Sequence, residues 1–145
     1  PGQWAIQTAL GGHQSIDELV CEGGRLRLQR DLAYQLITQI PGVSCVKPQA
    51  ALYMFPRLDP AIYPIEDDQQ FFLELLQETK VMLVQGTGFN WPAPDHFRIV
   101  FLPHEADLRE AIRRLAAFLQ KARRRFGTDG KGHGHTAAPS TALNA

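Results

Sequence analysis

Residues 81–103 read VMLVQGTGFNWPAPDHFRIVFLP, and the fold expected for the chain follows from this stretch. Its first four residues form an apolar run of strand length. Residues 96–101 alternate, with Phe97, Ile99 and Phe101 on one side, as in a strand that buries one face. The glycines and prolines between the two runs are typical of a loop. The stretch therefore predicts two strands joined by a glycine-containing loop.

Arg98 is the candidate binding residue of this stretch. Because side chains alternate along a strand, Arg98 projects from the face opposite Phe97 and Ile99. Most arginines in such a position are simply solvated on an open sheet face and bind no ligand. The loop over residues 85–92 favours a ligand instead, since its two glycines permit close backbone approach and its two aromatic residues supply an apolar wall. The candidate loop residues are Gly86, Thr87, Phe89 and Asn90.

Short elements are predicted on the amino-terminal side of this stretch. Apolar residues recur at helical spacing over residues 24–40, after a short helix candidate over residues 3–10. Residues 43–46 and 51–55 read as two strands joined by the turn Lys47-Pro48-Gln49-Ala50, hence as an antiparallel hairpin.

Two further helices complete the expected fold. An acidic cluster over residues 66–68 suits a helix amino terminus, and the apolar residues after it predict a helix that ends near Lys80. An apolar stripe predicts a last helix over residues 105–126, with a solvated cationic end. The order of elements predicts a two-layer α/β (α+β) domain, a small mixed sheet with helices packed against it. Residues 127–145 have almost nothing to bury and are expected to be disordered.

Composition excludes several classes of function. The 145 residues are 44% apolar and 21% charged, which is typical of a globular domain. The net charge is zero and no apolar run approaches the roughly 20 residues that cross a bilayer, so neither a nucleic-acid nor a membrane partner is expected. Cys21 and Cys45 lack metal-ligand spacing, and His133 and His135 lack a third ligand, so no metal is expected and a reducing, cytoplasmic setting is favoured.

Several segments carry a resemblance to a known family. They are PGQWAIQTALGG (1–12), IPGVSCVKPQAALYMFPRLD (40–59), VMLVQGTGFNWPAPDHFRIVFLP (81–103) and the closing amphipathic helix. With these motifs in this order, the chain resembles the carboxyl-terminal portion of the class I aminotransferases of fold type I. Within that family it is most similar to bacterial alanine aminotransferases. The resemblance runs from residue 1 to about residue 119.

The resemblance implies a domain division and a site. Residues 1–23 would be the end of a large domain and the interdomain segment, and residues 24–126 the small domain that closes over the substrate. In the family, pyridoxal 5'-phosphate is held as a Schiff base by a lysine of the large domain. Arg98 matches the arginine that grips the substrate α-carboxylate, beside the loop of Gly86, Thr87, Phe89 and Asn90. Where many relatives have Pro-Gly, this chain has Gln85-Gly86.

The implied activity belongs to a longer protein. The resemblance implies ping-pong transfer of an amino group between L-alanine or L-glutamate and a 2-oxo acid, in a homodimer. None of the four lysines of the chain lies in a family lysine segment, so no catalytic or cofactor-binding residue is assigned and the chain alone is expected to be inactive. Since residue 1 is proline and not an initiator methionine, a preceding part is expected as well.

A second function from another class stays open. Some transcription regulators carry an aminotransferase-like domain that senses an effector, and a small sheet-and-helix module could bind amino acids without chemistry. A Ser-x-x-Lys segment just upstream would favour the enzyme, and a winged helix far upstream would favour the regulator.

Overall fold

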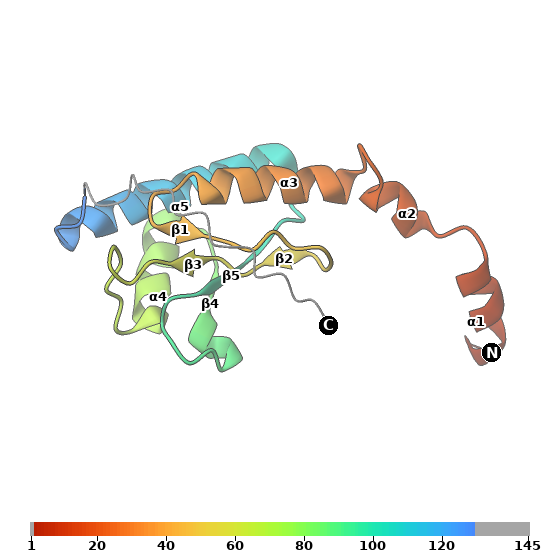
Figure 1. Ribbon diagram of the computed structural model, residues 1–145, viewed down its shortest axis with the longest axis horizontal. Helices are drawn as coiled ribbons and strands as arrows, with labels where there is room; N and C mark the ends of the chain where they lie inside the picture. Colours follow the sequence, from red (N-terminus) through yellow and green to blue (C-terminus); the bar gives the residue numbers. More distant parts are fainter. Residues whose placement is uncertain (1, 130–145) are drawn as a thin grey trace, which may run out of the picture.

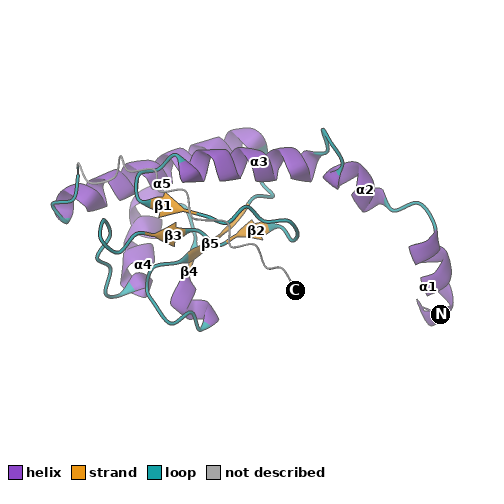
Figure 2. Cartoon of the chain, in the orientation of Figure 1, coloured by secondary structure: helices purple, strands orange, loops and turns teal. Residues whose placement is uncertain are grey.

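The computed structural model describes residues 2–129 (Figure 1). Five α-helices lie in this range: α1 (Gly2–Gly11), α2 (Ser15–Val20), α3 (Arg25–Thr38), α4 (Asp68–Thr79) and α5 (Glu105–Arg125). The strands are β1 (Val43–Ser44), β2 (Tyr53–Met54), β3 (Arg57–Leu58), β4 (Val84–Gln85) and β5 (Phe97–Val100). A 3-10 helix, η1 (Gly86–Phe89), follows β4. Figure 2 shows helices α3, α4 and α5 gathered around the short strands, which confirms the predicted α/β class.

The strands form two small antiparallel sheets. One has the order β1-β3 and the other the order β2-β5-β4. In the second sheet Tyr53 pairs with Val100 and Met54 with Ile99, while Val84 pairs with Arg98. A mixed sheet was predicted, but each of these described pairs is antiparallel.

The predicted hairpin between residues 43–46 and 51–55 is wrong. β1 pairs with β3, and β2 pairs with β5 instead of its neighbour in sequence. The pairing along β5 continues past β2, because the backbone N–H of Phe97 donates to the carbonyl of Pro56 and that of Leu58 to the carbonyl of Asp95. Residues 53–58 thus run antiparallel alongside residues 95–100. This pairing satisfies backbone groups between Tyr53 and Leu58.

The predicted strand over residues 81–84 is also shorter in the structure. Only its last residue, Val84, pairs with β5, and the strand continues to Gln85. β5 itself confirms the expected alternation, since Phe97, Ile99 and Phe101 are buried.

The core lies between the three longer helices and the sheets. On α5 the buried residues follow the predicted helical stripe: Leu108, Ile112, Leu115, Phe118, Leu119 and Ala122. They pack with Phe71, Phe72 and Leu75 of α4 and with Ala33 and Ile37 of α3. Gln29, a polar residue of α3, is buried among them, and its side-chain amide donates to the carbonyls of Leu102 and Pro103. This contact fixes α3 to the corner between β5 and α5.

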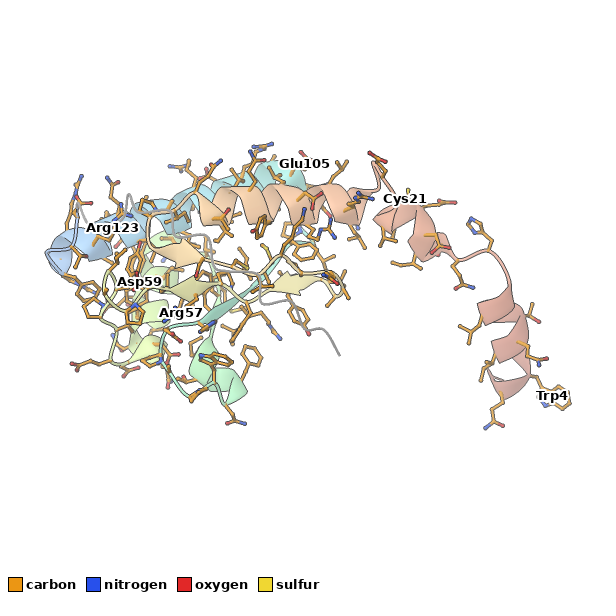
Figure 3. The ribbon with its side chains drawn as sticks, in the orientation of Figure 1. Trp4, Cys21, Arg57, Asp59, Glu105 and Arg123 are labelled. Carbon is orange, nitrogen blue, oxygen red and sulfur yellow. The ribbon has the colours of Figure 1, made fainter. Side chains whose placement is uncertain are left out.

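The cationic end of α5 is only partly the solvated surface that was predicted. Arg123, labelled in Figure 3, is buried and donates to the carbonyl of Pro41, which also accepts from the hydroxyl of Tyr63. Arg125 pairs with Glu74 of α4, and Arg124 with Asp129. The end of α5 is thus joined to α4 and to the segment that follows α3.

Helices α1 and α2 stand apart from this core. Neither contains a buried residue, and Figure 1 shows them extending away from the amino-terminal end of α3. Trp4 of α1 is 92% exposed and points away from the body of the structure in Figure 3. The helix over residues 3–10 was expected, whereas α2 was not. Ile6 and Leu10 of α1 are also exposed, and a group of uncovered apolar side chains is typical of a surface that another part of a protein covers.

The ordered structure also continues beyond the predicted boundary at residue 127. Gly127 adopts a positive φ of 67° at the end of α5, which turns the chain back toward the core. Thr128 is buried, and its hydroxyl donates to the carbonyl of Ile62 at 2.7 Å. The remainder of the predicted tail, residues 130–145, lies outside the described residues.

Replacing Thr128 therefore tests this boundary. Thr128→Val keeps the volume and removes the hydroxyl donor, so we expect the free energy of unfolding to fall by about 1 kcal/mol. Thr128→Ser keeps the donor and is the matched control, expected to stay closer to the wild type. Urea unfolding measures the stability of the two variants, and equal stability of the valine variant and the wild type would show that the Thr128 hydroxyl bond to Ile62 contributes nothing to stability.

Candidate functional site

The candidate site lies on the face of the β2-β5-β4 sheet that the helices leave open. Phe97 and Ile99 point into the core, so Arg98 between them points out, as the sequence predicted. The Arg98 guanidinium carbon lies 4.5 Å from the ring centre of Phe89 and 5.6 Å from that of Tyr53. None of the ion pairs or side-chain hydrogen bonds found among residues 2–129 involves Arg98.

This arrangement is suited to binding a carboxylate. An aromatic ring against a guanidinium attracts its charge and leaves its in-plane N–H donors free. Two parallel donors of an arginine match the two oxygens of a carboxylate. Arg98 is therefore a cation with aromatic walls and with no carboxylate partner among the described residues.

The loop beside Arg98 is held by a buried acid of α4. Asp68 is 3% exposed, and its carboxylate accepts from the Thr87 hydroxyl at 2.6 Å and from the Thr87 backbone N–H at 3.1 Å. Asn90 ends η1 in the left-handed region, with φ of 58°, a conformation that asparagine tolerates better than most residues. These contacts fix the turn that presents Phe89.

Gly86 is the point of closest approach between the loop and β5. Its N–H donates to the carbonyl of His96 at 2.7 Å, and a Cβ at this position would lie 2.8 Å from the same oxygen. Gly88 differs, because a Cβ there would meet side-chain atoms at 3.6 Å or more. Close backbone approach was predicted for this loop, and only Gly86 makes it.

A second acid, Asp95, organises the other side of the loop. Its carboxylate accepts from Nδ1 of His96 at 2.7 Å, Nε of Arg57 at 3.0 Å and Nε1 of Trp91 at 3.0 Å. Burial raises the pKa of Asp95, but these hydrogen bonds more than offset it and lower the pKa from 3.8 to about 2. The His96 ring also stacks on Phe55, with centroids 4.9 Å apart.

The structure thus separates the predicted site residues by what they contact. Phe89 lies directly against Arg98, whereas Gly86, Thr87 and Asn90 shape the turn. Sequence reasoning missed three contributors: Tyr53, Asp68 and Asp95. Tyr53 pairs with Val100 and is therefore the diagonal neighbour of Arg98. The predicted hairpin paired this strand with residues 43–46 instead, so the contact between Tyr53 and Arg98 was not predicted.

The described residues do not fit the holding of pyridoxal phosphate. A Schiff base needs a free lysine amine at the site. Lys47 pairs with Asp31, Lys121 pairs with Glu78, and Lys80 donates to the carbonyl of Gln77. None of these three contacts the Arg98 loop, and Lys131 lies outside the described residues. Within residues 2–129, therefore, no lysine amine is placed to anchor that cofactor beside Arg98.

Potential metal ligands and the Cys45 thiol are two further groups on which chemistry could rest within residues 2–129. No group of three or more potential ligands lies together in this range, and the two tail histidines, His133 and His135, fall outside it. Burial raises the pKa of the Cys45 thiol to about 11, with a smaller opposite effect from the Phe55 N–H, so this thiol stays protonated at neutral pH. No helix among the described residues has the length and apolarity to cross a membrane.

Comparisons with known proteins identify the family of this domain. The family model described as aminotransferase class I and II matches residues 1–115. The chain is 62% identical over 119 residues to the alanine aminotransferase of Mycobacterium tuberculosis, an alignment that covers 82% of this chain and 28% of that relative. It is 58% identical over 119 residues to the glutamate-pyruvate aminotransferase AlaA of Escherichia coli K12, which covers 82% of this chain and 29% of that relative.

A solved structure shares the fold. An aminotransferase from Escherichia coli superposes with a TM-score of 0.77 at 57% identity, over 83% of this chain and 30% of that one. The chain belongs to the class I and II aminotransferase family, whose members depend on pyridoxal phosphate. It spans less than a third of the length of these relatives.

The two glycines of the loop give a matched test of the geometry. Gly86→Ala places a methyl group against the His96 carbonyl, so we expect the free energy of unfolding to fall by about 1–3 kcal/mol. Gly88→Ala meets only ordinary contacts and should leave stability unchanged or slightly raised. Thermal unfolding compares the two, and equal effects would contradict the close approach at Gly86.

The Asp95 network gives a pH-dependent test. Since the pKa of Asp95 in the folded state lies below its ordinary value, the ionised carboxyl stabilises the fold at neutral pH, and this contribution is lost as pH falls from about 4 to about 2. Asp95→Asn should lower the free energy of unfolding by about 2 kcal/mol at pH 7 and have little effect near pH 2.

Other carboxyls also titrate in this window, so the difference between wild type and variant is the quantity to follow by urea unfolding at several pH values. Asp17→Asn, on exposed α2, is the control. A constant difference from pH 7 to pH 2 would rule out the proposed ionisation effect at Asp95.

Proposed function

We propose that Arg98 binds the α-carboxylate of an amino-acid substrate in a longer enzyme of which this chain is the carboxyl-terminal part. The enzyme exchanges an amino group between L-alanine or L-glutamate and a 2-oxo acid by a ping-pong mechanism. The observation that carries this proposal is the Arg98 guanidinium, held between Phe89 and Tyr53 with no carboxylate partner among the described residues. The names of the relatives in the comparisons support the alanine and glutamate pair.

The part played by this chain is recognition and orientation. A bidentate contact from Arg98 would fix the carboxylate end of the substrate and so fix the direction of its α-hydrogen. The aromatic side chains beside Arg98 would exclude water from that contact, which strengthens it. Catalytic and cofactor-binding groups would come from residues outside this chain.

We further propose the domain organisation and setting of the whole enzyme. Residues 24–126, with Thr128 packed on them, form the small domain, and residues 1–23 belong to the end of the large domain and the interdomain segment. The exposed apolar side chains of α1, Trp4 and Leu10 among them, support this division, since a large domain would cover them. We expect a cytoplasmic homodimer with small-molecule substrates and with no nucleic-acid or membrane partner.

Substitution of Arg98 in the full-length enzyme tests the proposal. Arg98→Lys keeps the charge but loses the second parallel donor, and Arg98→Ala loses both, so kcat/KM for alanine and glutamate should fall in the order wild type, lysine, alanine. A hydrogen bond to a charged group contributes about 1.5–3 kcal/mol, which predicts at least a tenfold loss in the alanine variant. The cofactor absorption band should be retained. Values of kcat/KM within about twofold of wild type in both variants would identify Arg98 as a solvated strand arginine.

A further inference from the structure

Arg98 differs from most other arginines of the structure in how it is held. Arg57, Arg113 and Arg125 each point at a carboxylate that fixes their guanidinium plane. Arg98 has no such partner among residues 2–129, and its guanidinium packs on the rings of Phe89 and Tyr53 instead. A long, flexible side chain that must bind a carboxylate in one orientation loses entropy on doing so, unless its position is set beforehand.

Phe89 makes the closer of the two ring contacts with Arg98, and hydrogen bonds to α4 fix the 3-10 helix that carries it. Phe89 ends η1, whose second residue, Thr87, is bound through both its hydroxyl and its backbone N–H to the buried carboxylate of Asp68. Phe55 also meets the Phe89 ring edge-on, with centroids 6.3 Å apart. A continuous series of contacts therefore runs from the first turn of α4 to Arg98, through Asp68, Thr87 and Phe89.

We propose that Phe89 is a positioning residue that holds the Arg98 guanidinium ready for the substrate carboxylate, and that the Asp68–Thr87 pair holds Phe89 in place. This inference rests on the proposed carboxylate-binding role of Arg98. The ring orients the guanidinium plane and removes water from one of its faces, while the in-plane donors stay free. The contribution of Phe89 to substrate binding therefore passes through Arg98 and should disappear when that guanidinium is absent.

A double-mutant cycle in the full-length enzyme measures this dependence. We compare Phe89→Leu, Arg98→Lys and the combined variant, using KM for alanine and the inhibition constant of propionate, which has the carboxylate of alanine but no amino group. Phe89→Leu alone should raise both constants about three- to fivefold, the range expected when a partly exposed cation–π contact is lost. Added to Arg98→Lys, it should change them less than about 1.5-fold. Phe89→Tyr keeps a ring at this position and should restore near-wild-type values.

A matched control separates positioning from general loosening. Phe126 also packs on an arginine, Arg125, at 5.2 Å, but at the far end of α5. Phe126→Leu should therefore leave KM and the propionate inhibition constant unchanged. Equal effects of Phe89→Leu with and without Arg98→Lys, or no effect in either background, would overturn the inference. If Arg98→Ala itself retained wild-type kcat/KM, the proposed function would fail instead, so the two failures are distinguishable.

The support from α4 is tested by a second pair of variants. Thr87→Val removes the hydroxyl bound to Asp68, and Thr79→Val removes a comparable hydroxyl that donates to the Leu75 carbonyl at the other end of α4. Thr87→Val should weaken propionate inhibition at least twofold in the Arg98 enzyme and not in the Arg98→Lys background. Thr79→Val should have no such effect. Equal propionate inhibition constants for the two valine variants would remove Asp68 and Thr87 from the proposed series of contacts.

Discussion

The antiparallel pairing of residues 53–58 with β5 is the contact on which the site depends. It makes β5 the central strand of its sheet, so that Phe97, Ile99 and Phe101 face the helices. Strand alternation then leaves Arg98 only the opposite, open face. The same register brings Tyr53 diagonally across to Arg98. The packing of the core and the placement of Arg98 on the open face therefore follow from one pattern of backbone hydrogen bonds.

The two acids near the open face, Asp68 and Asp95, bind other donors and leave Arg98 without an ion pair among the described residues. Asp68 is bound to the loop through Thr87, and Asp95 is bound to His96, Arg57 and Trp91. Both carboxylates satisfy their acceptors with local donors, so neither turns toward Arg98. The buried Asp68 and the partly buried Asp95 thus bind the residues on either side of the loop while leaving the guanidinium without a carboxylate of its own among the described residues, an arrangement that favours an incoming anion.

The sequence predicted best what depends on local periodicity. The stripe of α5 and the alternation of β5 were confirmed, because spacings of 3.6 and 2.0 residues place side chains on one face whatever the rest of the chain does. The outward direction of Arg98 follows from the second spacing alone. The predicted hairpin was wrong. Lys47-Pro48-Gln49-Ala50 has turn-forming residues, but the partner of β2 is β5, which lies more than forty residues further along the chain and is in no local pattern.

By itself the sequence determined the class of fold, the strand that carries Arg98 and, through its motifs, the resemblance to aminotransferases. Only the tertiary structure decided that Asp68 fixes Thr87, that Asp95 gathers three donors, and that Phe89 and Tyr53 flank the guanidinium. The physical reason is that secondary structure follows from neighbours within a few residues, whereas a carboxylate withdrawn from solvent is satisfied by donors from any part of the chain that folding brings to it. The site is built from such distant contacts.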